Sequence, residues 1–335
     1  LEERIVNILV LDVAASESGA LTILKEYYEK AKRDLDNQYL FCVSTTELES
    51  VGNVKVLTLP WTKKSWLHRL WFELVTVNKI VKSNDIQCVF SLQNLIIRDV
   101  KCEKWIYLHN PIPFTKVKFS PIKDTKMWVY KQLVGKLMIS SLKKADKIIV
   151  QTGWMKEACI EKTKVKPEII EVNMPEIDTK DIVVCEDRNS VKKKFFYPAT
   201  AFKYKNHMRL LEAVRLVYEQ CQDFEVNLTL SGNENERSKA MYEYVNEHKL
   251  PVNFLGYMPR ERVMEYYSTH TLIFPSYIET FGLPLLEARL SNTMIIASDC
   301  AFSNEILRGY DAVTYFDPFD VEKISKAIID SLEDS

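Results

Sequence analysis

The chain has 335 residues, with 45 Lys and Arg against 46 Asp and Glu and a formal net charge of −1. Hydrophobic residues make up 47% of the chain and charged residues 27%, which excludes a disordered protein and a fibre. No apolar run reaches the roughly 18 residues that a transmembrane helix needs. No signal peptide is predicted, and the length favours two domains over a single large one.

The cysteines point to a reducing compartment. There are seven, and none lies in a Cys-x-x-Cys pair. The odd number argues against a disulfide framework, and the spacing argues against structural zinc. We therefore expect a cytoplasmic protein.

The charge is unevenly distributed along the chain. Residues 194–335 carry 14 basic and 21 acidic residues (−7), whereas residues 1–193 carry 31 and 25 (+6). Most of the excess lies in 101–147, with 11 lysines and three acids. This asymmetry predicts an anionic partner such as a membrane surface, a phosphorylated lipid or a nucleic acid.

Aromatic residues are interleaved with these lysines. Two interpretations stay open: a surface that docks on anionic lipid or a lipid-phosphate acceptor, at the inner face of the membrane, and an amphipathic helix with solvated lysines. Nucleic acid is disfavoured, because no known nucleic-acid module accompanies the charge. The aromatic residues are Trp105, Tyr107, Phe114, Phe119, Trp128 and Tyr130.

In the first half of the chain, apolar strands alternate with helical patterns. Residues 4–13 are almost entirely apolar and β-branched, as in a parallel strand that is covered on both faces. A turn of small residues at 14–20 contains Gly19. This alternation predicts a doubly wound parallel sheet. Further strands are expected at 38–44, 54–59, 87–91, 104–108 and 147–151, with helices at 21–35, 65–82, 125–144 and from 153.

The second half repeats the architecture after a polar, acidic segment. We predict an amino-terminal Rossmann-like domain over 1–175, a linker over 176–193 and a carboxy-terminal Rossmann-like domain over 194–335. Ligands of open α/β sheets bind at the carboxyl ends of the strands, so a cleft between the two sheets is expected. Strands are expected at 194–198, 225–231, 252–255, 271–275, 294–297 and 313–316, with helices at 206–221, 235–248, 260–268, 284–291 and 320–332.

Residues 274–297 form the most informative stretch. Glu279 and Glu287 flank the sequence Phe-Gly-Leu-Pro. Pro284 suits the first turn of a helix, and Gly282 lets the backbone approach a ligand closely. The free N–H groups at a helix start suit a phosphate, and a carboxylate in that first turn, Glu287, can accept hydrogen bonds from a ribose diol. The pattern predicts a site for a nucleotide diphosphate that carries a polar group.

This stretch resembles the Glu-x7-Glu motif of the retaining GT-B glycosyltransferases of family 4, the glycosyl transferases group 1 domain. Residues 197–213, 228–232 and 254–258 are similar to further motifs of the donor domain, and 145–151 to the strand before the linker. The resemblance implies that Lys205 binds the donor phosphates, that Tyr257 and Met258 border the base, and that Gly19 faces the diphosphate. The implied donor-binding set is Gly19, Lys205, Tyr257, Met258, Glu279, Thr280, Phe281, Gly282, Leu283 and Glu287.

The resemblance also implies a reaction. A hexose moves from a nucleotide-diphosphate sugar to an acceptor hydroxyl, with retention at the anomeric carbon and front-face attack. His109, Lys205 and Glu279 are the implied catalytic residues. No cofactor and no metal are expected, because lysine and backbone groups replace the cation. The implied acceptor is a sugar or a lipid-linked sugar in bacterial surface polysaccharide or glycolipid synthesis.

Some residues depart from the family pattern. Ala199-Thr200-Ala201 stands where the family usually has an arginine, and Asn292 stands where it has a glycine. Asparagine tolerates positive φ, so that turn is expected to persist. Two alternatives stay open: a nucleotide-sugar epimerase of the same fold, and a non-catalytic nucleotide-sugar binder. A nicotinamide dehydrogenase is disfavoured, because no Gly-x-Gly-x-x-Gly follows the first strand.

Overall fold

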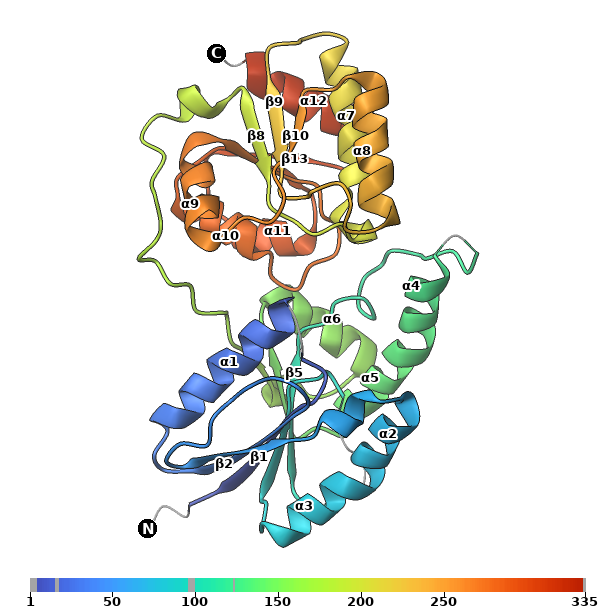
Figure 1. Cartoon of the computed structure of the whole chain (residues 1–335), viewed down its shortest axis with the longest axis vertical. Helices are drawn as coiled ribbons and strands as arrows, with labels where there is room; N and C mark the ends of the chain where they lie inside the picture. Colours follow the sequence, from blue (N-terminus) through green and yellow to red (C-terminus); the bar gives the residue numbers. More distant parts are fainter. Residues whose placement is uncertain (1–4, 16–17, 96–99, 123, 334–335) are drawn as a thin grey trace. The chain divides into compact units, whose positions relative to one another are not determined.

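The computed structural model describes residues 5–15, 18–95, 100–122 and 124–333. The chain forms two compact units, Leu1–Met174 (unit 1) and Pro175–Ser335 (unit 2). Each unit contains one parallel β-sheet covered by helices (Figure 1). The predicted fold class, two Rossmann-like α/β domains, is therefore confirmed.

Unit 1 has a sheet of seven strands in the order β3-β2-β1-β4-β5-β6-β7, and each neighbouring pair is parallel. The order reverses at β1, which is the switch point of a doubly wound sheet. The strands are β1 (Asn7–Asp12), β2 (Gln38–Val43), β3 (Val54–Thr58), β4 (Cys88–Ser91), β5 (Glu103–Leu108), β6 (Lys147–Val150) and β7 (Ile170–Val172). The helices are α1 (Ser18–Arg33), η1 (Pro60–Lys63), α2 (Trp66–Trp71), η2 (Phe72–Thr76), α3 (Val77–Ser83), α4 (Thr125–Val129), η3 (Tyr130–Val134), α5 (Gly135–Leu142), α6 (Gly153–Thr163) and η4 (Pro167–Ile169).

Helices cover both faces of this sheet, as the apolar strands require. Successive side chains of a strand point to opposite faces. Leu9 of β1 accordingly packs with Phe72, in the helical stretch that includes α3, while Val10 packs with Leu24 of α1. Figure 1 shows α1 and α3 on opposite sides of the sheet. Burial on both faces explains why the central strands β1 and β4 carry few polar residues.

The two longest predicted helices of unit 1 each contain a π-helical turn. The segment predicted at 65–82 is α2, η2 and α3, with the π turn at Phe72–Thr76. The segment predicted at 125–144 is α4, η3 and α5, with the π turn at Tyr130–Val134. A π turn adds one residue to a helical turn and so shifts the side chains that follow it.

In the part of the chain that the structure describes, no helix has the length and apolar character needed to cross a bilayer.

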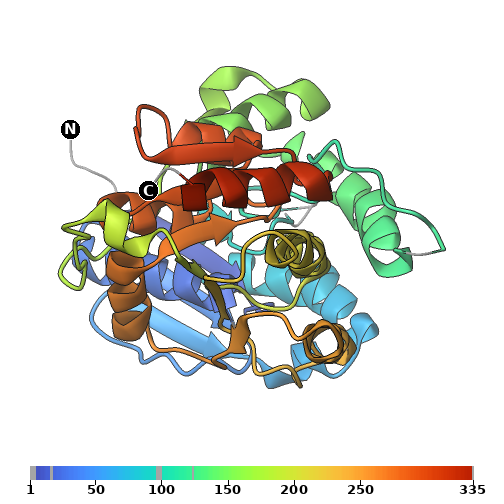
Figure 2. The same ribbon diagram turned by 90° about the horizontal axis from the view of Figure 1, so that it is seen from above.

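Unit 2 has a sheet of six strands in the order β10-β9-β8-β11-β12-β13, again all parallel. Helix α12 packs beside α7 on one of its faces (Figure 2). The strands are β8 (Lys194–Tyr197), β9 (Glu225–Leu228), β10 (Val252–Phe254), β11 (Thr271–Phe274), β12 (Ile295–Ser298) and β13 (Val313–Phe316). The helices are η5 (Arg188–Val191), η6 (Lys203–Lys205), α7 (His207–Tyr218), α8 (Glu236–His248), α9 (Arg260–Thr269), α10 (Leu283–Leu290), α11 (Ala301–Ile306) and α12 (Val321–Glu333).

The segment predicted as a linker, 176–193, is grouped with unit 2, and its second half packs on that unit. The Cys185 N–H donates to the carbonyl of Ser291 at 2.7 Å, and Arg188 Nε donates to the carbonyl of Asn292 at 3.0 Å. Asn292 has φ +58°, so the turn expected there does persist.

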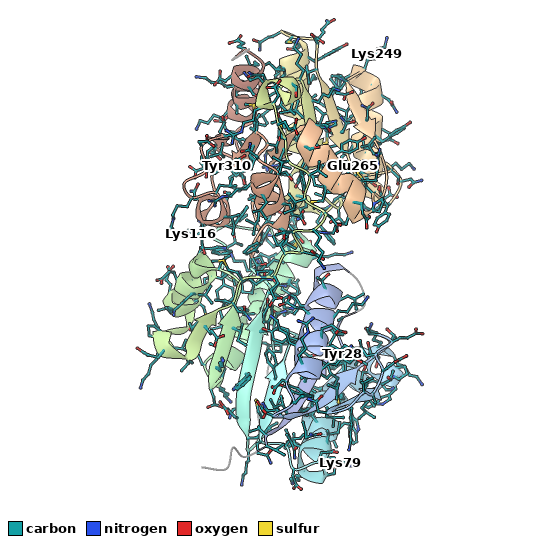
Figure 3. The ribbon with its side chains drawn as sticks, turned by 90° about the vertical axis from the view of Figure 1, so that its left-hand side faces the viewer. Tyr28, Lys79, Lys116, Lys249, Glu265 and Tyr310 are labelled. Carbon is teal, nitrogen blue, oxygen red and sulfur yellow. The ribbon has the colours of Figure 1, made fainter. Side chains whose placement is uncertain are left out.

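Charged side chains such as Lys79, Lys249 and Glu265 are exposed on the surfaces of the two units (Figure 3).

Candidate functional site

In unit 2, two loops that follow neighbouring strands are bonded together. One follows β8 and contains η6; the other follows β11 and leads to α10. The Tyr277 N–H donates to the carbonyl of Tyr204 at 3.0 Å. The buried Asn206, with φ +64°, donates through Nδ2 to the carbonyls of Pro275 at 3.1 Å and Pro318 at 2.7 Å. These bonds hold Lys205 and Glu279 in fixed positions at the carboxyl edge of the sheet.

Lys205 and Glu279 form a close ion pair. Lys205 Nζ lies 2.5 Å from Glu279 Oε1, and the two side chains are only 17% and 15% exposed. Ser276 Oγ donates to the same Oε1 at 2.6 Å, and Tyr197 donates its hydroxyl proton to the carbonyl of Lys205 at 2.8 Å. A lysine ammonium has three N–H donors, so one that binds a carboxylate can still bind phosphate oxygens. The pair thus combines a cation for a diphosphate with an acceptor for hydroxyl groups.

Helix α10 begins as the sequence predicts. Gly282 has φ +89°, and a Cβ at this position would lie 3.2 Å from Leu285 Cδ1. Only glycine fits such a backbone without strain. Pro284 is the second residue of the helix, where its missing N–H costs nothing. In this first turn Pro284 has no N–H, and the Leu285 N–H donates to the carbonyl of Gly282 at 2.9 Å. This leaves the Leu283 N–H at the helix start available to an anion.

Glu287 is more enclosed than the sequence indicates. It is the fifth residue of α10, one turn beyond the first helical turn that we expected, because the helix starts at Leu283. It is 6% exposed, and burial raises its pKa, an effect opposed by Arg260. Arg260 forms an ion pair with Oε1, and the Tyr267 hydroxyl donates to Oε2 at 3.2 Å. Sequence reasoning missed both partners, since they lie 27 and 20 residues away without a motif of their own.

The residues predicted to border the base lie in the loop between β10 and α9. Tyr257 is 92% exposed, and Met258 is partly buried. The loop leads directly into α9, whose first residue is Arg260, the partner of Glu287. The exposed Tyr257 ring, three residues before Arg260 in the chain, is available to stack on a flat ligand.

In unit 1, the carboxyl edge of the sheet holds His109 directly after β5. His109 Nε2 lies 2.9 Å from the carbonyl of Leu92 and 2.9 Å from Asn94 Nδ2, and the backbone N–H of His109 donates to Asn94 Oδ1 at 2.8 Å. Burial lowers the pKa of His109, so the neutral imidazole is favoured. Within the described ranges, Nδ1 makes no hydrogen bond and is the ring atom that remains for a substrate.

Asp12 is a second candidate at this edge, and sequence reasoning missed it. It ends β1 and is 2% exposed. Oδ1 accepts from the Ala15 N–H at 3.0 Å, whereas Oδ2 has no hydrogen-bond partner in the described part of the chain. Burial raises the pKa of Asp12 from 3.8 to about 6, against the influence of the Ala15 N–H and of Arg69. Asp12 follows a run of apolar residues in β1 and belongs to no motif, so the sequence gives no signal that its carboxyl group is part of a functional site.

Two further expectations concern Gly19 and metals. Gly19 is the second residue of α1 rather than part of a turn, since the helix begins at Ser18; its surroundings lie outside the described residues. Among the residues that the structure describes, no three His, Cys, Asp or Glu side chains are grouped as they would be around a metal ion.

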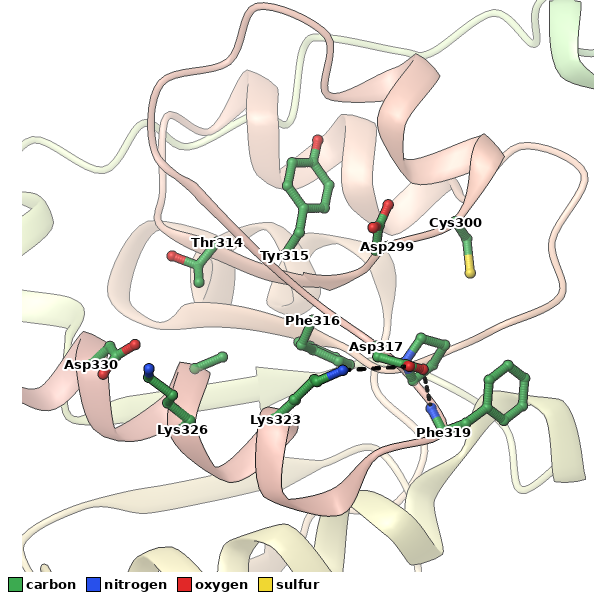
Figure 4. Close-up of a pocket in the computed structure, with 12 residues that line it drawn as sticks. Asp299, Cys300, Thr314, Tyr315, Phe316, Asp317, Phe319, Lys323, Lys326 and Asp330 are labelled. Carbon is green, nitrogen blue, oxygen red and sulfur yellow. Dashed lines mark hydrogen bonds and ion pairs between the residues drawn. The ribbon is translucent and has the colours of Figure 1, made fainter.

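A hollow of unit 2 lies beside β13 and α12 and has a volume of about 640 Å³ (Figure 4). Lys323 points toward Asp317, with Nζ and Oδ2 3.9 Å apart, and the Phe319 N–H donates to Asp317 Oδ1 at 2.9 Å. The lining carries both charges, and none of the predicted site residues belongs to it. It gives no support to the predicted donor site.

Comparisons with known proteins connect the chain to glycosyltransferases. Residues 180–335 match the family model described as glycosyl transferases group 1. O-antigen chain mannosyltransferase B of Escherichia coli is 31% identical over 141 residues, which are 41% of this chain and 36% of that protein. O-antigen chain mannosyltransferase RfbU of Salmonella typhimurium is 20% identical over 312 residues, 87% of this chain and 86% of that protein. The match to the first relative thus spans little more than a third of its length.

Solved structures resemble the whole chain. Sucrose-phosphate synthase from Thermosynechococcus elongatus has a TM-score of 0.73 and 16% identity, with 99% of this chain and 90% of that chain covered. Anabaena Alr3699/HepE, solved in complex with UDP-glucose, has a TM-score of 0.69 and 15% identity, with 98% and 90% covered. At these identities the similarity establishes the fold, which is that of GT-B glycosyltransferases.

Proposed function

We propose that the chain transfers a hexose from a nucleotide-diphosphate sugar to an acceptor hydroxyl, as the match of residues 180–335 to the glycosyl transferases group 1 model suggests. The observation that carries the proposal is the Lys205–Glu279 pair, 2.5 Å apart, on loops that are bonded to each other beside the start of α10. A cation, a carboxylate and a backbone N–H at a helix start are groups that a diphosphate and a sugar require. Membership of family 4 within this group stays a prediction.

The leaving diphosphate is the first problem of the reaction. The bond between the anomeric carbon and the phosphate oxygen breaks with its electron pair on that oxygen, so negative charge grows on the diphosphate. Lys205 and the Leu283 N–H at the start of α10 would stabilise this charge. Such preorganised electrostatic groups are often the largest contribution to catalysis. We propose that no metal ion takes part in this step.

The donor sugar and nucleoside need acceptors and a stacking surface. Glu279, which Ser276 and Lys205 hold in place, would accept hydrogen bonds from the sugar hydroxyls. Glu287 would accept from the ribose diol, sharing its oxygens with Arg260 and Tyr267. Tyr257 would stack on the base, with Met258 beside it. Thr280, Phe281 and Leu283 would supply backbone contacts around Gly282.

The acceptor oxygen would attack from the face that the diphosphate leaves. Its proton would pass to the departing phosphate oxygen, and the new glycosidic bond would retain the anomeric configuration. His109, with its lowered pKa, would be neutral and would contact the donor sugar through Nδ1. NMR of the product tests this part directly, since the one-bond C–H coupling at the anomeric carbon distinguishes retention from inversion.

The relatives suggest candidate substrates. Two are named O-antigen chain mannosyltransferases, and one structural neighbour was solved with UDP-glucose. We propose a lipid-linked sugar acceptor in surface polysaccharide synthesis, at the cytoplasmic face of the membrane. GDP-mannose and UDP-hexoses are therefore the first donors to test.

The test is release of nucleoside diphosphate from each donor in the presence of EDTA, with and without a lipid-linked saccharide. Release that depends on the acceptor supports transfer. A nucleotide sugar that isomerises without acceptor would indicate an epimerase. Binding without turnover across all acceptors would indicate a binding protein, which the missing arginine at Ala199-Thr200-Ala201 makes the relevant alternative.

A further inference from the structure

Helix α2 and its π turn in unit 1 expose apolar side chains that a folded unit normally buries. Phe72 is fully buried, but the residues around it face solvent. We call the exposed set the α2 ridge. It consists of Trp66 (73% exposed), Leu67 (59%), Leu70 (42%), Trp71 (60%) and Leu74 (52%). Contiguous apolar surface of this kind marks a site of protein or membrane interaction.

A second exposed apolar row lies on the same side of the sheet. Val129, Leu133 and Leu137 are 37%, 61% and 49% exposed and are spaced by four residues along α4, η3 and α5. Helix α5 packs on Ile106 of β5 and the α2–α3 stretch packs on Val89 of β4. These two strands are neighbours, with Phe90 opposite Trp105, so Val89 and Ile106 point to one face. Figure 1 shows α2 and α5 on this side of unit 1.

The surroundings of both rows are basic. Residues 60–85 carry five basic and two acidic residues, and residues 115–144 carry eight and one. Lys63 and Lys64, which precede α2, are exposed, whereas Glu73 of η2 forms an ion pair with Arg69 of α2 at 2.8 Å. Interfaces between proteins are depleted in lysine, while lysine beside tryptophan suits anionic headgroups. The charge therefore favours a bilayer over a second protein chain as the occupant.

The exposed aromatic residues do not lie where the sequence predicts a membrane-binding surface, in the basic stretch 101–147. Three of the six aromatic residues interleaved with lysine in 101–147, namely Tyr107, Phe114 and Phe119, are buried in the core, and the other three are partly buried. The stretch therefore offers a bilayer its positive charge and the row of Val129, Leu133 and Leu137 rather than these rings. The exposed tryptophans lie in α2, outside the basic stretch.

We propose that the α2 ridge inserts into the headgroup region of an anionic bilayer, with exposed lysines of 116–144 in contact with the lipid phosphates. These lysines are Lys116, Lys118, Lys126, Lys136, Lys143 and Lys144. Tryptophan prefers this depth, where its ring is partly apolar and its N–H stays hydrated. Insertion would hold the chain at the surface where a lipid-linked acceptor is found. The inference rests on unit 1 alone and holds independently of the proposed transferase activity.

Vesicle cosedimentation of the full chain tests the proposal. The probes are vesicles of phosphatidylcholine alone and of phosphatidylcholine with phosphatidylglycerol. We expect the wild type to bind the anionic vesicles and Trp66→Ala/Trp71→Ala to bind at least about tenfold more weakly, since two large apolar side chains are lost. The matched control is Ile5→Ala/Leu35→Ala, which removes two exposed apolar side chains of unit 1 outside the ridge (60% and 78% exposed) and should bind as the wild type does.

Folding does not confound the test, because the substituted side chains are exposed and the melting temperatures are measured for every variant. Leu70→Glu provides a second disruption of the ridge and should also weaken binding. Wild type that ignores anionic vesicles, or tryptophan variants that bind them unchanged, would overturn the proposal. So would a wild-type dimer that becomes monomeric in Trp66→Ala/Trp71→Ala without any vesicle binding, because the ridge would then be a subunit interface.

Discussion

The Lys205–Glu279 pair makes a quantitative prediction about stability. Removing one partner of a buried ion pair costs about 3–5 kcal/mol when the other charge is left uncompensated. Here both side chains keep some exposure, and Ser276 continues to donate to Glu279. We therefore expect Lys205→Met to lower the free energy of unfolding by about 2–3 kcal/mol, because the Glu279 carboxylate is left without its cation. Glu279→Gln should cost only about 1 kcal/mol, because the freed Lys205 ammonium can turn to solvent more easily than the carboxylate can.

The double variant separates the pair from its surroundings. It leaves no unpaired charge, so its cost should fall short of the sum of the single variants by about 1–2 kcal/mol. For a unit of this size, 1 kcal/mol corresponds to roughly 2–4 °C in melting temperature, which calorimetry of the full chain resolves. The matched control is the exposed pair Arg215–Glu219, 2.6 Å apart, for which the coupling should be at most about 0.5 kcal/mol. Additive effects at Lys205 and Glu279 would refute the view that they form one preorganised unit.

Three further predictions concern single residues. Burial raises the pKa of the Asp12 carboxyl group from 3.8 to about 6, so as the pH rises the unfolded chain loses this proton at a lower pH than the folded chain does. The free energy of unfolding of the wild type should therefore decrease as the pH rises from about 4 to about 6. Asp12→Asn should remove this loss and be more stable than the wild type by up to about 3 kcal/mol above pH 6, which urea unfolding across this pH range measures; equal stability of both proteins at pH 7 would contradict the assigned pKa. Gly282→Ala should cost about 1–2 kcal/mol, because φ is +89° and the new Cβ meets Leu285; an unchanged melting temperature would contradict the strain. His109→Gln should lower the turnover number at least about tenfold while nucleotide affinity stays unchanged, and a loss in affinity alone would argue against contact with the donor sugar.

Much of the fold could be predicted from local patterns. Apolar, β-branched runs such as 4–13 are typical of strands buried on both faces, and the order of strands and helices leaves few topologies. The start of α10 was equally local, since Gly282 and Pro284 each suit one backbone conformation. The π turns were not predictable, because they change a helical period within a segment that still looks helical.

The contacts of the site depend on long-range packing and so escaped prediction. Lys205 and Glu279 are 74 residues apart, and the sequence does not indicate that their loops are bonded together. Arg260, which neutralises Glu287, has the same appearance as any surface arginine. The helical spacing of Trp66 and Trp71 likewise predicts a stripe but not whether the stripe faces the core or the solvent.

The central claim is that unit 2 binds a nucleoside diphosphate through Lys205, the start of α10 and Glu287. The most direct measurement is the melting temperature of the chain with UDP, GDP, ADP or dTDP in the presence of EDTA, repeated on Glu287→Gln and on Glu219→Gln as the control. The account predicts that one nucleotide stabilises the wild type and the control, by about 2.7 kcal/mol at a hundredfold excess over Kd, and that Glu287→Gln loses most of this gain. Stabilisation that needs a metal, that persists in Glu287→Gln, or that no nucleotide produces would contradict it.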